Sequence, residues 1–439
     1  MQHAGLLLRV APLFLVATAC SSSIVGESWP DQSWPAMDAF EFGEFAQAAD
    51  DFESLQGDLG GNEFLALAEA GMASHAGGDL DSARAYWLEA EGVLEGFKDR
   101  PTLSGRSVGE GAASMALNDR ALPYDGEDFE TALLHAFLAW DFLRSGDLDG
   151  AMVEVRHGYE VETRAEEKYE TDYAMNRFNR FVAALSQETD QAWDDAILDW
   201  KALLAEMPES KDLSRCLENA EKARAGGGPS ASIVLIHEKG RMPSKESHSL
   251  DYSTQRSMGH VVAPAFSNPM PSPGRIELWV DGEFLGKTFV LEDVHSVAKE
   301  NLADRIAWIA GKSVIRAAIK TALVDELAED VEEEKGFWAG LGVGILGSLL
   351  VYGTEQADLR SWQTLPQQIQ ALRALVEPGT HHIALKFKSR GEDRTLDLGD
   401  VDILPGSNLL LTARTLRRTA MGQVGNAPAV LLSPANLKP

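Results

Sequence analysis

The sequence has few cysteines and a deficit of basic charge, and each excludes a class of protein. Of 439 residues only Cys20 and Cys216 are cysteine, so a buried apolar core, and not a disulfide framework, must stabilise the fold. The formal net charge is -29. Because basic surfaces neutralise nucleic-acid phosphates and attract anionic lipid headgroups, this balance predicts no nucleic-acid partner and no broad electrostatic binding to membranes.

Long hydrophobic runs are also scarce. The apolar stretch over 10–17 is too short to span a bilayer, which needs about 20 apolar residues. It follows Arg9 and ends in the small residues Ala17–Ala19 directly before Cys20. This arrangement matches the bacterial lipoprotein signal and predicts a signal peptide over 1–20 with acyl chains on the cysteine. The alternative is an ordinary secretory signal cleaved just before that cysteine.

A polar stretch with two Ser-Trp-Pro sequences, 21–36, predicts a tether behind the lipid. Residues 37–210 then show helical periodicity and an internal repeat, in which a small residue is followed four positions later by a large one. The pairs are 35, 68 and 45 residues apart, and the first two intervals are close to one and two tetratricopeptide periods of about 34 residues. An irregular insertion lies over 97–128. The expected fold is therefore an all-α, degenerate tetratricopeptide-like array of helical hairpins, with turns at Gly43, Gly78 and Gly146 and with the pairs Ala48/Phe52, Ala83/Trp87, Ala151/Val155 and Ala196/Trp200.

The glycine-rich end of a helical linker over 211–229 marks a boundary. Beyond it the pattern changes to β, with Asp281-Gly282 as a two-residue hairpin turn. The region 230–420 is expected to be an α+β domain, β-sandwich-like with a helical insert over 296–352, and 421–439 a tail. Its strands are expected at 233–236, 276–280, 283–290, 382–387, 394–398 and 409–416.

Two patterns associated with enzymes lack the context that they need. Residues 105–109 match the nucleophile-elbow pattern, but a polar, proline-containing segment precedes them in place of a strand. Residues 342–347 match the dinucleotide fingerprint, but an acidic run precedes them. The histidines His237, His381 and His382 lack the spacing of a metal site. The sequence therefore predicts no catalytic residue, no metal and no cofactor.

A basic stripe lies in the helical insert. Lys312, Arg316 and Lys320 are spaced four residues apart within an otherwise apolar helix over 306–324. In so acidic a chain this stripe suggests a site for an anion or an acidic partner. The alternative is that the three bases pair with the protein's own carboxylates, for which Asp325, Glu326 and Asp358 are candidates.

The stretches 124–130, 146–156 and 357–366 resemble a family of bacterial lipoproteins with tetratricopeptide-like repeats on the N-terminal side and a β-containing C-terminal domain. The resemblance extends over most of the chain after the signal peptide, and Asp-x-Arg-Ser-Trp-x-x-Leu-Pro, within 357–366, is its most specific part. It implies this order of domains and no activity.

On a strand, Asp358, Arg360 and Trp362 would share one face. This arrangement predicts a structural cluster in which the carboxylate pairs with the guanidinium and the indole covers it.

Together these features predict a non-enzymatic scaffold of the bacterial cell envelope that binds envelope proteins through its helical repeats. The lipid on Cys20 would attach it to a membrane, and Ser21 in the next position favours the outer membrane, facing the periplasm. One alternative is a hydrolase that acts on a cell-wall or lipid substrate through the C-terminal domain. Another is an assembly factor that inserts 337–352 into the bilayer, a segment that would otherwise be a buried helical hairpin.

Overall fold

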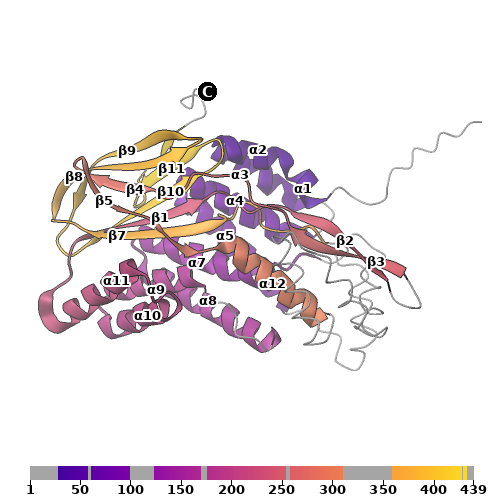
Figure 1. Ribbon diagram of the computed structural model, residues 1–439, viewed down its shortest axis with the longest axis horizontal. Coiled ribbons are helices and arrows are strands. Elements are labelled where there is room, and N and C mark those ends of the chain that lie inside the picture. Colours follow the sequence, from indigo (N-terminus) through magenta and orange to yellow (C-terminus); the bar gives the residue numbers. More distant parts are fainter. Residues whose placement is uncertain are drawn as a thin grey trace, which may run out of the picture.

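The chain folds into helices followed by strands (Figure 1), as the sequence predicts. The computed structural model describes residues 28–57, 61–98, 123–169, 176–253, 258–309, 358–427 and 429–432. Cys20, the basic stripe of Lys312, Arg316 and Lys320, and the segment 337–352 lie outside the described residues. Among the described helices, none is long and apolar enough to cross a membrane.

The helices before the sheets pair into hairpins. They are α1 (Trp29–Gln32), α2 (Trp34–Phe42), α3 (Phe45–Ser54), α4 (Glu63–Gly77), α5 (Leu80–Lys98), α7 (Asp128–Arg144), α8 (Leu148–Tyr169), α9 (Arg177–Thr189), α10 (Trp193–Glu206) and α11 (Lys211–Lys222). The small and large residues of each expected pair are buried on the second helix of a hairpin, namely α3, α5, α8 and α10. A small residue at such a position lets two helices approach closely.

The turns of these hairpins lie where the sequence predicts them. Gly43, Gly78 and Gly146 have φ of 81°, 83° and 79°, a left-handed conformation that glycine adopts without a steric penalty. In two of the turns an aspartate follows the glycine and starts the next helix. Asp79 accepts the N–H of Ser82 at 3.1 Å, and Asp147 accepts that of Gly150 at 2.9 Å.

The expected tether over 21–36 is wrong for its second half. Residues 29–32 and 34–42 form α1 and α2, with Trp29 buried in the core and Trp34 exposed. Both Ser-Trp-Pro sequences start helices because a proline fits the first turn, where its missing N–H has no intrahelical partner.

The strands form two sheets and a separate hairpin, with register set by long-range pairing. The six-stranded sheet has the order β12-β11-β10-β1-β7-β6, the four-stranded sheet the order β5-β4-β8-β9, and β2 pairs with β3. The bounds are β1 (Ser232–Lys239), β2 (Lys245–Ser253), β3 (Met258–Phe266), β4 (Glu277–Val280), β5 (Glu283–Lys287), β6 (Phe289–Glu292), β7 (Gln368–Leu375), β8 (Gly379–Ser389), β9 (Glu392–Ile403), β10 (Asn408–Thr415), β11 (Ala420–Val424) and β12 (Val430–Leu432).

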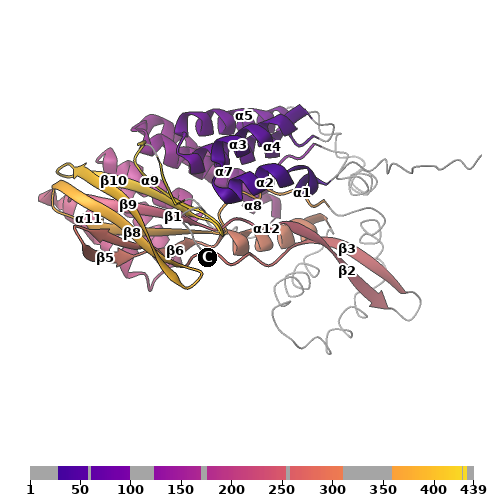
Figure 2. The same ribbon diagram turned by 90° about the horizontal axis from the view of Figure 1, so that it is seen from above.

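A strand lies in each expected range, but 283–290 is divided at Thr288 into β5 and β6, which belong to different sheets. β2, β3 and β7 were not expected, and the predicted tail over 421–439 is wrong, because β11 and β12 pair onto the edge of the six-stranded sheet. The hairpin β2–β3 projects away from both sheets (Figure 2). Of the helical insert, the structure describes α12 (Val294–Ile309).

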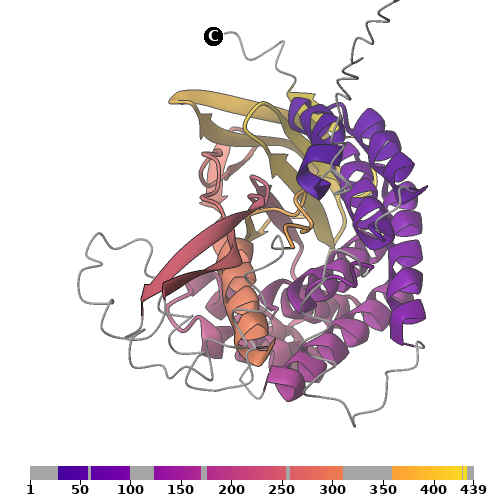
Figure 3. The same cartoon turned by 90° about the vertical axis from the view of Figure 1, so that its right-hand side faces the viewer.

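The six-stranded sheet is the middle of three layers. From β1, Val234 and Ile236 pack into a core shared with the helices, whereas Ile233 and Leu235 pack into a second core shared with the four-stranded sheet. Burial on both faces explains why this strand is a continuous apolar run. Figure 3 shows the helices as an arc, with the strands and α12 along its inner side. The helical and sheet-rich parts therefore share a core and pack as one unit.

Candidate functional site

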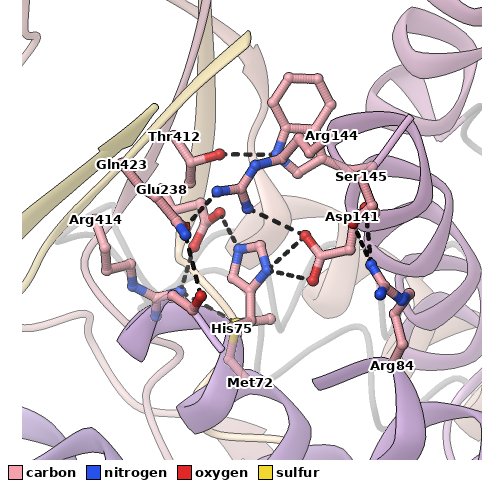
Figure 4. A network of polar contacts seen from close by, with 12 residues as sticks. Met72, His75, Arg84, Asp141, Arg144, Ser145, Glu238, Thr412, Arg414 and Gln423 are labelled. Atoms are coloured by element: carbon pink, nitrogen blue, oxygen red, sulfur yellow. Dashed lines mark hydrogen bonds and ion pairs between the residues drawn. The ribbon is translucent and has the colours of Figure 1, made fainter. Parts of the chain in front are cut away.

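A buried ionic network joins the helices to the six-stranded sheet (Figure 4). His75 on α4 donates through Nδ1 to Asp141 on α7 at 2.9 Å and through Nε2 to Glu238 on β1 at 2.7 Å. All three side chains are fully buried. Burial alone would lower the pKa of His75, but the two carboxylates outweigh it and raise the pKa to about 9. At neutral pH this ring is therefore an imidazolium ion.

Two buried arginines complete the network. Arg414 on β10 donates to Glu238 at 3.1 Å, and Arg144 on α7 donates to Asp141 at 3.2 Å and to the carbonyl of Gly425 at 2.8 Å. Burial would raise the pKa of Glu238, but His75 and Arg414 outweigh it and lower the pKa to about 2. Since the side chains at its centre are fully buried, the network holds the helical layer to the six-stranded sheet.

Residues 358–367, here called the strap, cross the inner face of the helices. The carboxylate of Glu69 accepts the backbone N–H groups of Gln363 at 2.7 Å and Thr364 at 2.8 Å, and Glu130 accepts that of Trp362 at 2.8 Å. Burial is the largest cause that raises the pKa of each of these carboxyls to about 7. Two acids inside the helical layer thus bind the backbone of the strap.

The three strap residues singled out by the sequence are only partly arranged as predicted. Arg360 donates from Nε and Nη2 to the two oxygens of Asp358 at 2.9 and 2.8 Å. Residues 358–363 form no strand, so the shared face considered from the sequence does not arise, and the ring under the guanidinium is Tyr124 at 5.1 Å and not Trp362. Trp362 instead packs edge-on against Trp87, with ring centroids 6.3 Å apart. Without a strand, residues two apart have no reason to share a face.

The three histidines that the sequence discounted as metal ligands have ordinary partners. His237 bonds to Gln370 at 3.1 Å and Thr415 at 2.8 Å, and burial lowers its pKa to about 4, so it is neutral. His381 and His382 pair with Asp281 and Asp400 near the surface.

Among the described side chains, one group does have ligand atoms close enough to hold a metal ion. It consists of Glu91, His135, Glu154 and His157, which were not singled out from the sequence.

An open groove of about 700 Å³ lies on the outer face of the four-stranded sheet. Strand alternation builds it, because Leu278 and Leu385 point into the core between the sheets while their neighbours Trp279 and Lys386 point outward. The Nζ of Lys386 lies 3.4 Å from the centroid of the Trp279 ring. Two of the lining residues are acidic, Glu277 and Asp393, and the basic ones are Arg275, Lys287, Lys386, Lys388 and Arg394.

This basic groove has the opposite sign to the chain as a whole. Lys287 lies 3.5 Å from Glu277, and Lys388 lies 3.9 Å from Asp393, so both acids face a base. Five bases against two acids leave a local charge of +3 in a chain of formal charge -29. A concave surface of this kind concentrates positive potential and attracts an anionic partner.

The chain was compared with known proteins at three levels. No protein-family model, no curated protein and no solved structure matches it. The function is therefore inferred from the geometry of this chain.

Proposed function

We propose that the protein is a non-enzymatic, membrane-anchored scaffold of the bacterial envelope that holds an acidic segment of a partner protein in the basic groove. The observation that carries the proposal is the groove itself, a basic hollow in an acidic chain. The lipoprotein signal that ends at Cys20 supports attachment to a membrane, and Ser21 after it favours the outer membrane.

The helical layer supports the scaffold in a different way from the one that the sequence suggests. Hairpins with buried small and large pairs favour a tetratricopeptide-like array, whose usual binding surface is the inner side of the arc. Here that side is taken up by the chain itself, since Trp140 donates to Thr412 on β10 at 2.9 Å and Glu69 binds the strap. A partner has to bind elsewhere, and the outer face of the four-stranded sheet offers the groove.

An acidic protein segment fits the groove better than a sugar polymer does. Sugars bind proteins largely by stacking on an aromatic face, but Lys386 covers one face of Trp279 and the Phe284 ring packs at 5.9 Å from it. The bases on β5, β8 and β9 are spread along the groove, and each lies beside an acid of the protein: Lys287 beside Glu277, Lys388 beside Asp393 and Arg394 beside Glu392. A row of carboxylates on a partner would compete for these solvent-accessible bases.

Charge reversal in the groove tests this proposal. The double variant Lys386→Glu with Lys388→Glu is expected to reduce recovery of the co-purified partner by at least about tenfold, because each reversal replaces an attraction by a repulsion of 1 kcal/mol or more. The measurement is affinity purification of the full chain from crosslinked cells, with the partner quantified by mass spectrometry. In a parallel purification without crosslinking, raising the salt concentration should also reduce recovery of the partner.

The matched control reverses two exposed lysines of the helical layer, Lys201→Glu with Lys222→Glu. This variant carries the same change in net charge and should recover the partner at the wild-type level. Equal losses in both variants would show that net charge, and not the groove, decides binding. Wild-type recovery by the groove variant would contradict the proposal.

A further inference from the structure

Two histidines and two glutamates meet where three helices of the array come together. Glu91 lies on α5, His135 on α7, and Glu154 and His157 on α8. One ligand atom from each residue lies within 4.8 Å of those of the other three. Imidazole nitrogen and carboxylate oxygen are the ligands that zinc and similar divalent metals take when no thiolate is present.

The spacing of the four groups suits a single ion. Glu154 and His157 are three residues apart and so share a face of α8. The Nδ1 of His135 lies 2.8 Å from Glu154, and the Nδ1 of His157 lies 3.1 Å from Glu91 and 3.8 Å from Glu154. In a tetrahedral site with bonds of about 2.0–2.2 Å, ligand atoms are roughly 3.3–3.6 Å from one another. The observed separations lie on both sides of that value, so small side-chain rotations would bring the atoms to it.

One ligand atom has unused bonding capacity. The Nδ1 of His157 is buried and forms no hydrogen bond within the described residues, although Glu91 Oε1 is only 3.1 Å away. A hydrogen bond is absent at that distance where the atoms are misaligned or where the ring nitrogen carries no proton. A ring nitrogen and a carboxylate oxygen whose lone pairs point to a common centre would show this arrangement. A buried polar atom without a hydrogen bond requires an explanation.

Burial and charge also fit a divalent cation. The side chains of His135 and Glu154 are 6% and 5% exposed, whereas those of Glu91 and His157 are 20% and 38% exposed. The inner pair would fix the ion, and the outer pair leaves a path by which it can enter. The carboxylates of Glu91 and Glu154 supply negative charge that a divalent ion compensates.

We propose that Glu91, His135, Glu154 and His157 form a binding site for a divalent transition metal, with Zn²⁺ as the probe. The bound ion joins α5, the second helix of one hairpin, to both helices of the α7–α8 hairpin. It acts as a brace within the helical layer, and this role is independent of partner binding in the groove.

Titration of the metal-free full chain with Zn²⁺, in competition with a chelator of known affinity, tests the site. One ion per chain is expected, and both His157→Ala and Glu91→Gln should weaken binding at least tenfold, the lower end of the loss seen even for residues that only support metal ligands. Zinc at about 100 times the wild-type Kd should raise the wild-type Tm by roughly 3–5 °C, and because tenfold weaker binding leaves about half of that stabilisation, it should raise the Tm of both variants by no more than about half as much. Both replaced side chains are partly exposed, and circular dichroism of each variant checks its fold.

The matched control is His382→Ala. His382 contacts Asp397 at 3.1 Å and Asp400 at 2.8 Å on the surface, and its loss should leave the stoichiometry and affinity for Zn²⁺ unchanged. The proposal is overturned if the wild type takes up no Zn²⁺ in this range. It is also overturned if a folded His157→Ala or Glu91→Gln binds as the wild type does, or if His382→Ala abolishes binding.

Discussion

Replacing Asp141 by alanine is expected to lower the free energy of unfolding by about 3–5 kcal/mol, the cost of removing one partner from a buried ion pair. Asp141 is fully buried and accepts hydrogen bonds from His75 and Arg144. Its loss leaves the imidazolium and guanidinium ions with fewer partners in the middle of the molecule, where water cannot replace them. Urea denaturation followed by tryptophan fluorescence measures the change, since Trp87 and Trp140 lie in the same core.

The matched control for this prediction is Asp81→Ala. Asp81 also pairs with an arginine of this region, Arg84, but its side chain is 92% exposed. Solvent screens such a pair, so the free energy of unfolding should change by less than about 1 kcal/mol. If the Asp141 variant lost as little as the Asp81 variant, the network would not be holding the helices to the sheet.

The second large effect is a fall in stability as pH rises from about 5 to about 9. Burial raises the pKa of the Glu69, Glu130, Glu162 and Glu292 carboxyls to about 7. Against its burial, the carboxylates of Asp141 and Glu238 raise the pKa of His75 to about 9. The folded chain therefore binds protons that the unfolded chain has already released.

The sign follows from this difference in bound protons. The contribution of each carboxyl is present below the unfolded value of 4.5 and is lost as pH rises through about 7. That of His75 is present below 6.5 and is lost as pH rises through about 9. The shift of His75 alone corresponds to about 3 kcal/mol. Two groups act oppositely. The pKa of Glu238 is lowered to about 2, so its contribution is lost only as pH falls below 4.5. Burial lowers the pKa of His237 to about 4, so its contribution is lost as pH falls below 6.5 and offsets part of the gain from the four carboxyls between pH 6.5 and 5.

Thermal unfolding between pH 5 and 9 at constant ionic strength measures this dependence. The Tm should be highest near pH 5 and decline steadily toward pH 9. Glu69→Gln should flatten the decline between pH 5 and 7, because it removes one of the titrating carboxyls, whereas the exposed Glu63→Gln on the same helix should not. A Tm that is constant or rises over this range would contradict the protonation of these groups in the folded chain.

The parts of the fold that the sequence predicts are those with local signals. The helix pairs depend on residues four apart and on glycine turns, and the Asp281-Gly282 hairpin depends on two adjacent residues with positive φ. β7 was missed because its sequence, Gln-Ile-Gln-Ala-Leu-Arg-Ala-Leu, consists mainly of residues that favour helices. Its pairing with β1 and β6, both distant in the sequence, overrides that preference.

The candidate sites likewise combine local contacts, which the sequence predicts, with long-range contacts, which it does not. The Asp358–Arg360 pair is local and was predicted, whereas the contact of the Arg360 guanidinium with the Tyr124 ring joins residues more than 200 positions apart. The groove requires β4 to pair with β8, which places Glu277 opposite Lys386, and no pattern within either strand indicates that register. For the metal site a local signal did exist, since Glu154 and His157 have helical spacing, but the other two ligands depend on how the hairpins pack.

The structure also changes how the function can be tested. Removing the helices over 38–210 would expose Val234, Ile236 and Trp362, which share their core. Loss of a partner after that deletion would report unfolding and not a binding surface. Point changes at exposed positions are therefore the informative ones.

Site-specific photo-crosslinking in cells at two exposed positions tests directly which surface the partner binds. Lys388 in the groove and Leu198 on the outer side of α10 have side chains 77% and 65% exposed. A photoreactive residue at 388 should capture a partner protein, with the crosslink mapping to an acidic segment of that partner and disappearing when Lys386→Glu is added. Position 198 should capture none. Capture at 198 with none at 388 would show that the partner binds the helical layer and not the groove on the four-stranded sheet, and would contradict the proposed function.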